Sequence, residues 1–529
     1  MAAEASVRGS VYLTMLMIDF FDRGATRFPD RACLIDDTGT RTYAQVRARS
    51  HQIANAFKRD NIPPGTKAAV YSGNSAAAFE CLIGSVRAGG VWTTVNARNL
   101  MSETIYVLNN TETDLIFFSI EFKDTIKEIL ANCPTVKWAI CIDGKIEGHP
   151  YLEDWLAGLP EMSEEVPRGL DDLVIMLSSG GTTGKPKGVL VTQRNWEAMT
   201  LLTHHLLLHD HAIHLVVGPM THAAGGQAMT MMAMGATHVV LPGFDGDRVL
   251  DAIEKYRVTH MFLPPTAIYM LLARPDIRKR DYSSLKIFLY SAAPMAVDKI
   301  KESIEVFGPI MYQGFGQTET GINMTWFSAE EHMRFYNAGD DAMLATCGRE
   351  TVLARVEIMD DEGHILPPDT LGEIVVRATS VAPGYYKNPE ETEKAKAFGW
   401  HHSGDIGRKD KDGWIFIVDR KKDMVISGGF NVYPSEIEGV IFSHAAIQDC
   451  AVIGVPDEKW GEALKAVVQL KPGAAFDEED LKEHCRKSLA RFKVPKSFDV
   501  VDQLPRSPAG KVLKRKIREP YWAGKTRAV

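Results

Sequence analysis

The sequence predicts an α/β protein in which helices wrap parallel β-sheets, followed by a β-rich subdomain and a smaller βαβ-like tail. Three observations lead to this prediction. The 529 residues exceed what one hydrophobic core normally supports, and 45% of them are hydrophobic, so two or more domains are expected. Apolar strand-like runs alternate with helical segments over the first part of the chain. From about residue 353 the strands become short, and turn residues separate them.

Short apolar runs indicate the buried strands of the first part of the chain. They cover residues 68–71, 114–118, 138–142, 174–177, 215–217, 261–263 and 287–290. Between them, residues 75–88 and 247–256 show the helical spacing of apolar residues. This alternation is typical of parallel sheets that helices cover on both faces.

The segment 212–244 contains no Asp, Glu, Lys or Arg, and its 33 residues would be long enough to cross a membrane. Its three histidines, Pro219, Pro242 and its paired glycines favour a buried α/β unit instead. We therefore expect strands at 213–217 and 238–241 around a helix near 228–234.

After about Leu353 the pattern changes to short strands with turns between them, which predicts a β-rich subdomain. These strands are expected at 354–358, 372–377 and 414–418, with a turn at 360–363.

The charged cluster 419–423 precedes the tail, and we expect the domain boundary between residues 421 and 422. In the tail, SGGFNVYP leads into a helix that Ser435 and Glu438 are expected to cap as S-x-x-E. Residues 486–527 hold 13 Lys or Arg against three acidic residues. This basic stretch is either an ordinary solvated face or a patch for a phosphorylated ligand.

Composition excludes several classes of partner. A formal net charge of -8 argues against general affinity for nucleic acids or anionic membranes, so small molecules are the expected partners. The seven cysteines are scattered and form no C-x-x-C, which argues against a disulfide framework or structural zinc and fits a reducing cytoplasm.

Residues 178–188 read SSGGTTGKPKG and directly follow an apolar run. Glycines allow backbone N–H groups to approach an anion, while the Ser and Thr hydroxyls and the two lysines add hydrogen bonds and charge. The segment is not the common P-loop, because three residues separate Gly180 from Gly184 and Pro186 follows Lys185. It predicts a polyphosphate-binding loop of another kind.

Three further motifs could complete a nucleotide site. In YQGFGQTETG (312–321), the hydroxyl of Thr318 suits a phosphate and the carboxylate of Glu319 suits Mg²⁺. In HHSGDIG, Asp405 is either a partner of ribose hydroxyls or a turn residue. In LPRSPAGKVLKRK, Lys511 follows two prolines and a glycine, and a loop lysine of this kind is usually only solvated.

These motifs, in this order and at these separations, closely resemble the adenylate-forming superfamily, which includes acyl-CoA synthetases, adenylation domains and beetle luciferases. The resemblance runs from the region of Phe20 to Lys511. It implies a large N-terminal domain (1–421) of two helix-wrapped β-sheets plus a β-barrel-like subdomain, and a small mobile α+β C-terminal domain (422–529). It also implies a two-step reaction, in which a carboxylate and ATP give acyl-AMP and pyrophosphate, and a thiol then displaces AMP.

The resemblance assigns roles to individual residues. Ser179, Thr182, Thr183 and Lys187 of the glycine-rich loop would bind phosphates, and Ala292, Ala293, Pro294 and Phe315 would flank the adenine. Thr318 would contact the α-phosphate, Glu319 would hold Mg²⁺, and Asp405 with Arg420 would bind the ribose. Lys511 would bridge the acyl carboxylate and the α-phosphate, and His222 would line the acyl tunnel, although alone it is more often a core histidine. Lys422 matches the hinge, and Gly429 would border the pantetheine tunnel.

The favoured function is an ATP- and Mg²⁺-dependent acid:CoA ligase acting on a hydrophobic medium-chain, long-chain or aryl acid. The resemblance leaves three alternatives open: loading of a carrier protein in trans, a luciferase-like oxidase, and a non-catalytic adenylate-binding protein. An amino-acid substrate is disfavoured, because residues 219–226 read PMTHAAGG where amino-acid-activating relatives typically carry an Asp. The expected enzyme is cytoplasmic and not an integral membrane protein, and a homodimer is left open.

Overall fold

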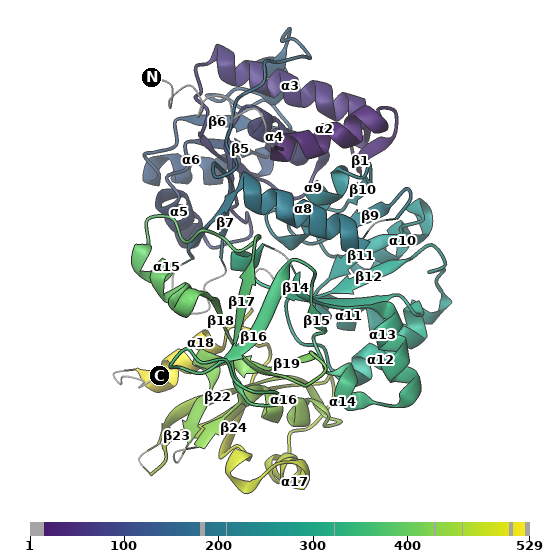
Figure 1. The fold of residues 1–529 in the computed structure, drawn as a ribbon, viewed down its shortest axis with the longest axis vertical. Coiled ribbons are helices and arrows are strands. Elements are labelled where there is room, and N and C mark those ends of the chain that lie inside the picture. Colours follow the sequence, from purple (N-terminus) through teal and green to yellow (C-terminus); the bar gives the residue numbers. More distant parts are fainter. Residues whose placement is uncertain are drawn as a thin grey trace.

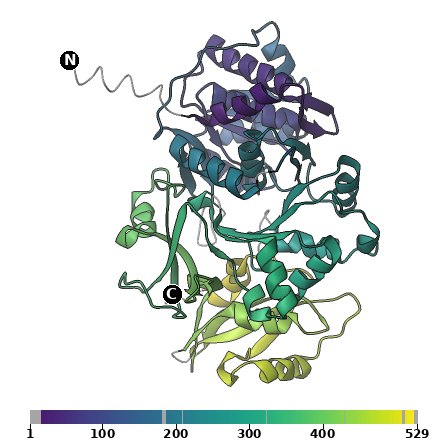
Figure 2. The ribbon, with the colours of Figure 1, turned by 45° about the vertical axis from the view of Figure 1, so that its right-hand side comes forward.

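The computed structural model describes residues 15–179, 186–207, 209–321, 323–427, 430–457, 459–506 and 512–523. These residues form four β-sheets with helices packed around them. In Figures 1 and 2 a six-stranded sheet lies at the top, a nine-stranded sheet in the middle, and a four-stranded and a five-stranded sheet below. The chain is thus the mixed α/β protein that the alternating pattern predicted.

The six-stranded sheet is parallel except at one edge, where β7 and β8 form an antiparallel hairpin. Its strands are, in spatial order, β6 (Trp138–Cys141), β5 (Leu115–Phe118), β3 (Lys67–Tyr71), β4 (Val91–Thr93), β7 (Leu173–Ser178) and β8 (Gly188–Thr192). The helices of this region are α2 (Met17–Arg27), α3 (Tyr43–Arg59), α4 (Ala76–Arg87), α5 (Met101–Asn110), α6 (Lys123–Asn132), α7 (Leu152–Leu156) and α8 (Gln193–Leu207).

The nine-stranded sheet has a parallel centre and an antiparallel strand or pair at each edge. Its order is β15 (Arg349–Glu350), β14 (Asn323–Phe327), β13 (Met311–Gly316), β12 (Ile287–Tyr290), β11 (His260–Leu263), β9 (Ile213–Val216), β10 (Thr237–Val240), β1 (Ala32–Asp36) and β2 (Gly39–Thr42). Its helices are α9 (Ala223–Met232), α10 (Gly246–Tyr256), α11 (Pro265–Leu272), α12 (Val297–Phe307), α13 (Ala329–Ala338) and α14 (Asp341–Leu344).

The β-rich subdomain is an antiparallel four-stranded sheet, with α15 (Pro389–Ala395) inserted before its third strand. Its strands are β16 (Ala354–Met359), β17 (Gly372–Ala378), β18 (His401–Lys409) and β19 (Ile415–Arg420). The predicted strands at 354–358, 372–377 and 414–418 all fall within these elements.

The tail forms the five-stranded sheet, in which β23, α17 and β24 make the expected βαβ unit because β23 and β24 are parallel. Its elements are β20 (Val425–Ser427), β21 (Phe430–Val432), α16 (Pro434–Phe442), β22 (Ile447–Asp457), β23 (Gly461–Leu470), α17 (Glu478–Ser488), β24 (Ser497–Val500) and α18 (Lys514–Arg518).

The predicted S-x-x-E cap of the tail helix is wrong. Helix α16 begins at Pro434 after Tyr433, so Ser435 lies inside its first turn. The Ser435 N–H donates to Asp419 Oδ2 at 2.8 Å, and Glu438 pairs with Lys514 Nζ at 2.8 Å. Both residues therefore join the helix to other elements, because tertiary partners compete with local capping.

The segment 212–244 forms β9, α9 and β10, as predicted for a buried α/β unit. Met229, Met231 and Met232 are at most 3% exposed and pack in hydrophobic cores. Helix α9 shares one of these cores with α2, α3, α4 and α8, and Figure 1 shows α8 between the two large sheets. None of the described helices has the length and apolar character needed to cross a membrane.

Candidate active site

The candidate site lies at the edge where parallel strands of the nine-stranded sheet end. Strands β9, β11, β12 and β13 are parallel neighbours, so their carboxyl ends meet at the same edge. Ligands of open α/β sheets bind outside this edge, where the following loops lie. His222 follows β9, residues 292–294 follow β12, and the short 3₁₀ helix η4 (Thr318–Thr320) follows β13. The topology therefore brings these predicted residues to one edge.

The glycine-rich loop joins β7 and β8 as an antiparallel hairpin, with Ser178 paired to Gly188. It thus differs from the common P-loop, which leads from a strand into a helix. The Ser179 N–H donates to the Lys187 carbonyl at 2.9 Å, and the Lys187 N–H donates to Ser179 Oγ at 3.2 Å. These bonds close the base of the loop. Thr182 and Thr183 lie outside the described residues.

The side chain of Lys187 contacts the segment 384–392. Its Nζ forms an ion pair with Glu391 of α15 and lies 4.8 Å from the ring centroid of Tyr385. The backbone fixes this approach, because the N–H groups of Leu190 and Tyr386 donate to the carbonyls of Gly384 and Gly188 at 3.0 and 2.8 Å. The hydrogen bond from the Lys187 ammonium lowers the pKa of Glu391, which favours the ionised form of that carboxyl group.

Glu319 is held from two sides by the same segment. The Tyr385 hydroxyl donates to Glu319 Oε1 at 3.0 Å, and the Ala382 N–H donates to the Glu319 carbonyl at 2.8 Å. Burial and the nearby carboxylate of Glu319 raise the pKa of Tyr385, so its hydroxyl keeps its proton and remains a donor. Thr318 and Glu319 are partly exposed, which leaves their side chains accessible to a ligand.

Asp405 and Arg420 face each other on strands β18 and β19, with Arg420 Nε 2.6 Å from Asp405 Oδ1. The Gln317 amide donates to Asp405 Oδ2 at 2.8 Å and to the Ser403 carbonyl at 2.6 Å. Asp405 is only 3% exposed and belongs to a strand, so the turn-residue alternative is wrong. Gln317 directly precedes Thr318, so its hydrogen bond to Asp405 connects β18 to η4.

The residues predicted to flank adenine follow or end neighbouring strands. Ala292, Ala293 and Pro294 are exposed just after β12, and Phe315 lies near the end of β13. Ala292 has a φ of 76°, a left-handed conformation that is rare for a residue with a side chain. Such backbone strain often accompanies a functional loop.

His222 is partly buried at the start of α9, with its Nδ1 3.4 Å from the Thr221 hydroxyl oxygen. The two glycines that follow are not equivalent. A Cβ on Gly225 would lie 1.7 Å from the Met220 carbonyl oxygen, whereas a Cβ on Gly226 would meet nothing within 4 Å. Gly225 is therefore needed for close packing, and Gly226 borders open space. The nearby methionines Met229, Met231 and Met232 belong to the core.

Two predicted residues of the tail, Lys511 and Gly429, lie outside the described residues. Lys422 lies in the 3₁₀ helix η6 (Lys421–Asp423), between the last strand of the four-stranded sheet and the first strand of the five-stranded sheet. Burial lowers the pKa of its amine to about 8.

Three residues that contact the predicted site were not identified from the sequence: Gln317, Tyr385 and Glu391. Gln317 sits inside the GFGQTETG motif, so its position beside Thr318 could have drawn attention to it. Tyr385 and Glu391 come from GYYKNPEET, whose spacing carries no local signal for the site. Only the pairing of this segment with β8 brings them there.

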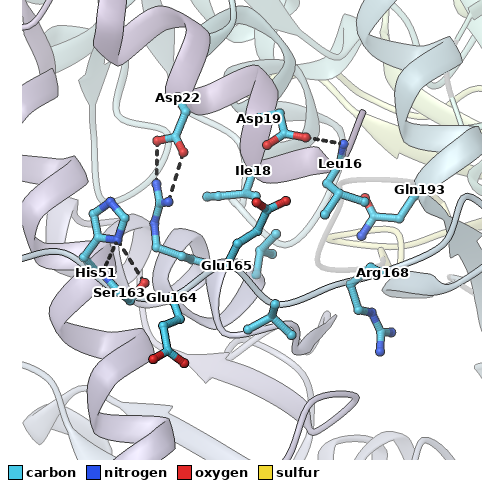
Figure 3. Close-up of a pocket in the computed structure, with 13 residues that line it drawn as sticks. Leu16, Ile18, Asp19, Asp22, His51, Ser163, Glu164, Glu165, Arg168 and Gln193 are labelled. Carbon is cyan, nitrogen blue, oxygen red and sulfur yellow. Dashed lines mark hydrogen bonds and ion pairs between the residues drawn. The ribbon is translucent and has the colours of Figure 1, made fainter. Parts of the chain in front are cut away.

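A separate cavity of about 190 Å³ lies among α2, α3, α4 and the segment 163–168. Two contacts occur in its lining: Arg87 pairs with Asp22, and His51 contacts Ser163, as Figure 3 shows. This cavity contains none of the predicted site residues.

Known proteins resemble the chain over most of its length. The family described as AMP-binding enzyme matches residues 21–386, and the one described as AMP-binding enzyme C-terminal domain matches residues 436–511. A feruloyl-CoA synthase of Amycolatopsis sp is 32% identical over 484 residues, covering 91% of this chain and 94% of that protein. The medium/long-chain-fatty-acid–CoA ligase FadD8 of Mycobacterium tuberculosis is 33% identical over 513 residues, covering 92% and 87%.

Among solved structures, ATP-bound MatB from Rhodopseudomonas palustris superposes with a TM-score of 0.87 at 29% identity, covering 96% of this chain and 99% of that one. The fold, the order of the motifs and the matched residues agree. This chain belongs to the AMP-binding enzyme family.

Proposed function

We propose that this protein is an ATP-dependent acid:CoA ligase. In the first step an acid carboxylate oxygen attacks the α-phosphorus of ATP, and the bond to pyrophosphate breaks. In the second step the CoA sulfur attacks the acyl carbon, and AMP leaves with the electrons of the broken C–O bond. The observation that carries this proposal is the linkage of Lys187 and Glu319 through Tyr385, beside the Asp405–Arg420 pair.

Each described residue has a chemical reason for its proposed role. Lys187 supplies positive charge to the β- and γ-phosphates, and Thr318 offers a hydroxyl to the α-phosphate. Asp405 accepts hydrogen bonds from the ribose hydroxyls, while the ion pair with Arg420 holds its carboxylate in place. Ala292, Ala293, Pro294 and Phe315 provide the walls of the adenine site.

Glu319 fits the role of a magnesium ligand. Among the described residues, no group of three or more His, Cys, Asp or Glu side chains could hold a metal ion. A single accessible carboxylate beside a phosphate site suits Mg²⁺, which is usually bound through one or two carboxylates together with substrate phosphates. When bound, the ion would neutralise charge on the phosphates of ATP.

The small C-terminal domain would begin at residue 422 and rotate about Lys422 between the two steps. Lys511 would then serve the first step, and Gly429 would border the path of pantetheine in the second. The position of η6 between two sheets that share no strand supports a hinge there. The seven buried, unpaired cysteines are in keeping with a reducing cytoplasm.

The proposed acid is hydrophobic, with a medium or long chain or an aryl group. The space beside Gly226 and the uncharged segment 212–244 support an apolar acyl site next to His222. Relatives named as feruloyl-CoA synthase and as medium/long-chain-fatty-acid–CoA ligase act on acids of this kind. Each methylene buried in such a site contributes about 0.8 kcal/mol, so catalytic efficiency should rise with chain length until the site is filled.

The test is pyrophosphate release with straight-chain acids from acetate to palmitate, plus benzoate, cinnamate and ferulate, each with and without CoA. We expect acid-dependent release of pyrophosphate and AMP, and thioester only with CoA. An acyl carrier protein in place of CoA forms a third arm. An optimum at acetate would contradict the proposed acid class, and exclusive use of the carrier protein would contradict the CoA assignment.

A further inference from the structure

The Tyr385 side chain contacts both Lys187 and Glu319. Its hydroxyl donates to Glu319 Oε1 at 3.0 Å, and its ring centroid lies 4.8 Å from Lys187 Nζ. The two charged residues come from different sheets, since Lys187 precedes β8 of the six-stranded sheet and Glu319 follows β13 of the nine-stranded sheet. Tyr385 therefore joins the two halves of the nucleotide site.

The backbone of Tyr385 is fixed on both sides. Val189 of β8 forms an isolated antiparallel bridge with Tyr385, and the Tyr385 N–H donates to the Thr392 hydroxyl at 3.0 Å. That hydroxyl in turn donates to the Asn388 carbonyl at 2.8 Å. The backbone of Tyr385 is thus held between β8 and α15.

We propose that Tyr385 is a positioning residue of the ATP site, which orients the carboxylate of Glu319 for the Mg²⁺ ion of ATP and supports the ammonium of Lys187. This inference rests on the proposed function, because it requires Glu319 to be a magnesium ligand. The hydroxyl binds Oε1, and Oε2 would remain for the ion. The ring face attracts the ammonium by a cation–π interaction.

The chemistry of the pair suits this role. A carboxylate that accepts a hydrogen bond from a neighbouring donor loses rotational freedom before the metal binds, and loss of such an outer contact typically weakens metal binding by about 10- to 100-fold. In the structure the Tyr385 hydroxyl is the donor of this contact, to Glu319 Oε1 at 3.0 Å.

The chain offers a matched control in the next residue. Tyr386 also donates its hydroxyl to a carboxylate, that of Glu112, at 2.7 Å, and it also lies near a lysine, Lys67. Tyr386→Phe thus removes the same group from the same kind of contact, one residue away but outside the proposed site. Both substitutions keep the aromatic ring and its packing.

The experiment measures ATP binding by titration calorimetry over a range of MgCl₂ concentrations, without acid or CoA, so that no turnover occurs. Tyr385→Phe is expected to raise the Mg²⁺ concentration for half-maximal ATP binding about tenfold, while Tyr386→Phe stays close to the wild type. Glu319→Gln should raise it at least as much. In the Glu319→Gln background, Tyr385→Phe should have no further effect.

The outcomes separate this inference from the proposed function. If Glu319→Gln shifts the Mg²⁺ requirement and Tyr385→Phe does not, Tyr385 is not a positioning residue, while the role of Glu319 stands. If neither shifts it, the magnesium assignment itself is wrong and the inference falls with it. An equal effect of Tyr385→Phe with and without Glu319 would also overturn the inference, because the phenol would then act elsewhere.

Discussion

At the scale of the residue, two ion pairs contribute charged side chains to the site. Lys187 pairs with Glu391, and Arg420 pairs with Asp405. The two pairs differ in burial: Asp405 is 3% exposed, whereas Lys187 remains partly accessible. We therefore expect Asp405 and Arg420 to fix the structure of the site, and Lys187 to be the residue that a phosphate can contact.

Lys187→Met tests the phosphate contact. Removing a charged hydrogen-bond donor costs about 1.5 to 3 kcal/mol, so the KM for ATP should rise roughly tenfold or more. The matched control is Lys394→Met, because Lys394 also contacts Glu391, at 3.3 Å, but on the exposed side of α15. Steady-state pyrophosphate release with varied ATP provides the measurement, and equal effects of the two substitutions would argue against a phosphate contact.

At the scale of the element, three adjacent strands carry a row of buried histidines. His238 of β10, His214 of β9 and His260 of β11 occupy paired or neighbouring positions, and the Nδ1 atoms of His214 and His238 lie 3.2 Å apart. Burial lowers the pKa of His238 to about 3 and that of His260 to about 4. These imidazoles are neutral in the folded protein.

This row predicts acid sensitivity of the nine-stranded sheet. The folded pKa values lie below the unfolded value of about 6.5. Above pH 6.5 these histidines are neutral in both states and do not lower the free energy of unfolding. As the pH falls from 6.5 toward 4, the unfolded state gains protons that the folded state does not bind, so the free energy of unfolding decreases. By pH 5 each such histidine should cost about 2 kcal/mol of stability. His260→Gln should therefore lose less thermal stability between pH 7.5 and pH 5 than the wild type. Calorimetry checks this, with the exposed His364→Gln as the control.

At the scale of the whole molecule, the proposed mechanism moves the small domain relative to the large one between the two steps. The proposed hinge is Lys422. Proline fixes φ near −65° and removes the backbone N–H, so Lys422→Pro should hold the protein in one conformation. We expect pyrophosphate release to persist while thioester formation is lost. Both are measured in one reaction mixture, and an intact overall reaction would contradict the hinge.

Lys511→Ala tests the complementary half of the same motion. If Lys511 offsets charge where pyrophosphate leaves, its removal should slow adenylation by about 10²- to 10³-fold. Conversion of supplied acyl-AMP and CoA to thioester should continue, because in the proposed mechanism the small domain carries Lys511 away before the thiol enters. Single-turnover assays of each half-reaction measure this, and equal loss in both would refute the assignment.

The sequence by itself determined the fold class, the buried strands and the order of the motifs. Apolar runs such as residues 287–290 have the length and continuity that are typical of a strand in a covered sheet, and the composition of SSGGTTGKPKG predicts a loop whose backbone can approach an anion. These patterns can be recognised in the sequence because they depend only on residues that are close together in the chain.

The tertiary structure decided which distant residues meet. Tyr385 and Glu391 reach Lys187 and Glu319 only because the segment 384–386 pairs with β8. Ser435 and Glu438, which would cap a helix if local geometry alone counted, instead bind Asp419 and Lys514. The sequence around Asp405 is compatible with a turn, but Asp405 pairs with Arg420 of β19 and lies in strand β18. Contacts across sheets depend on strand order and register, and these are fixed by packing of the whole core, so no local pattern encodes them.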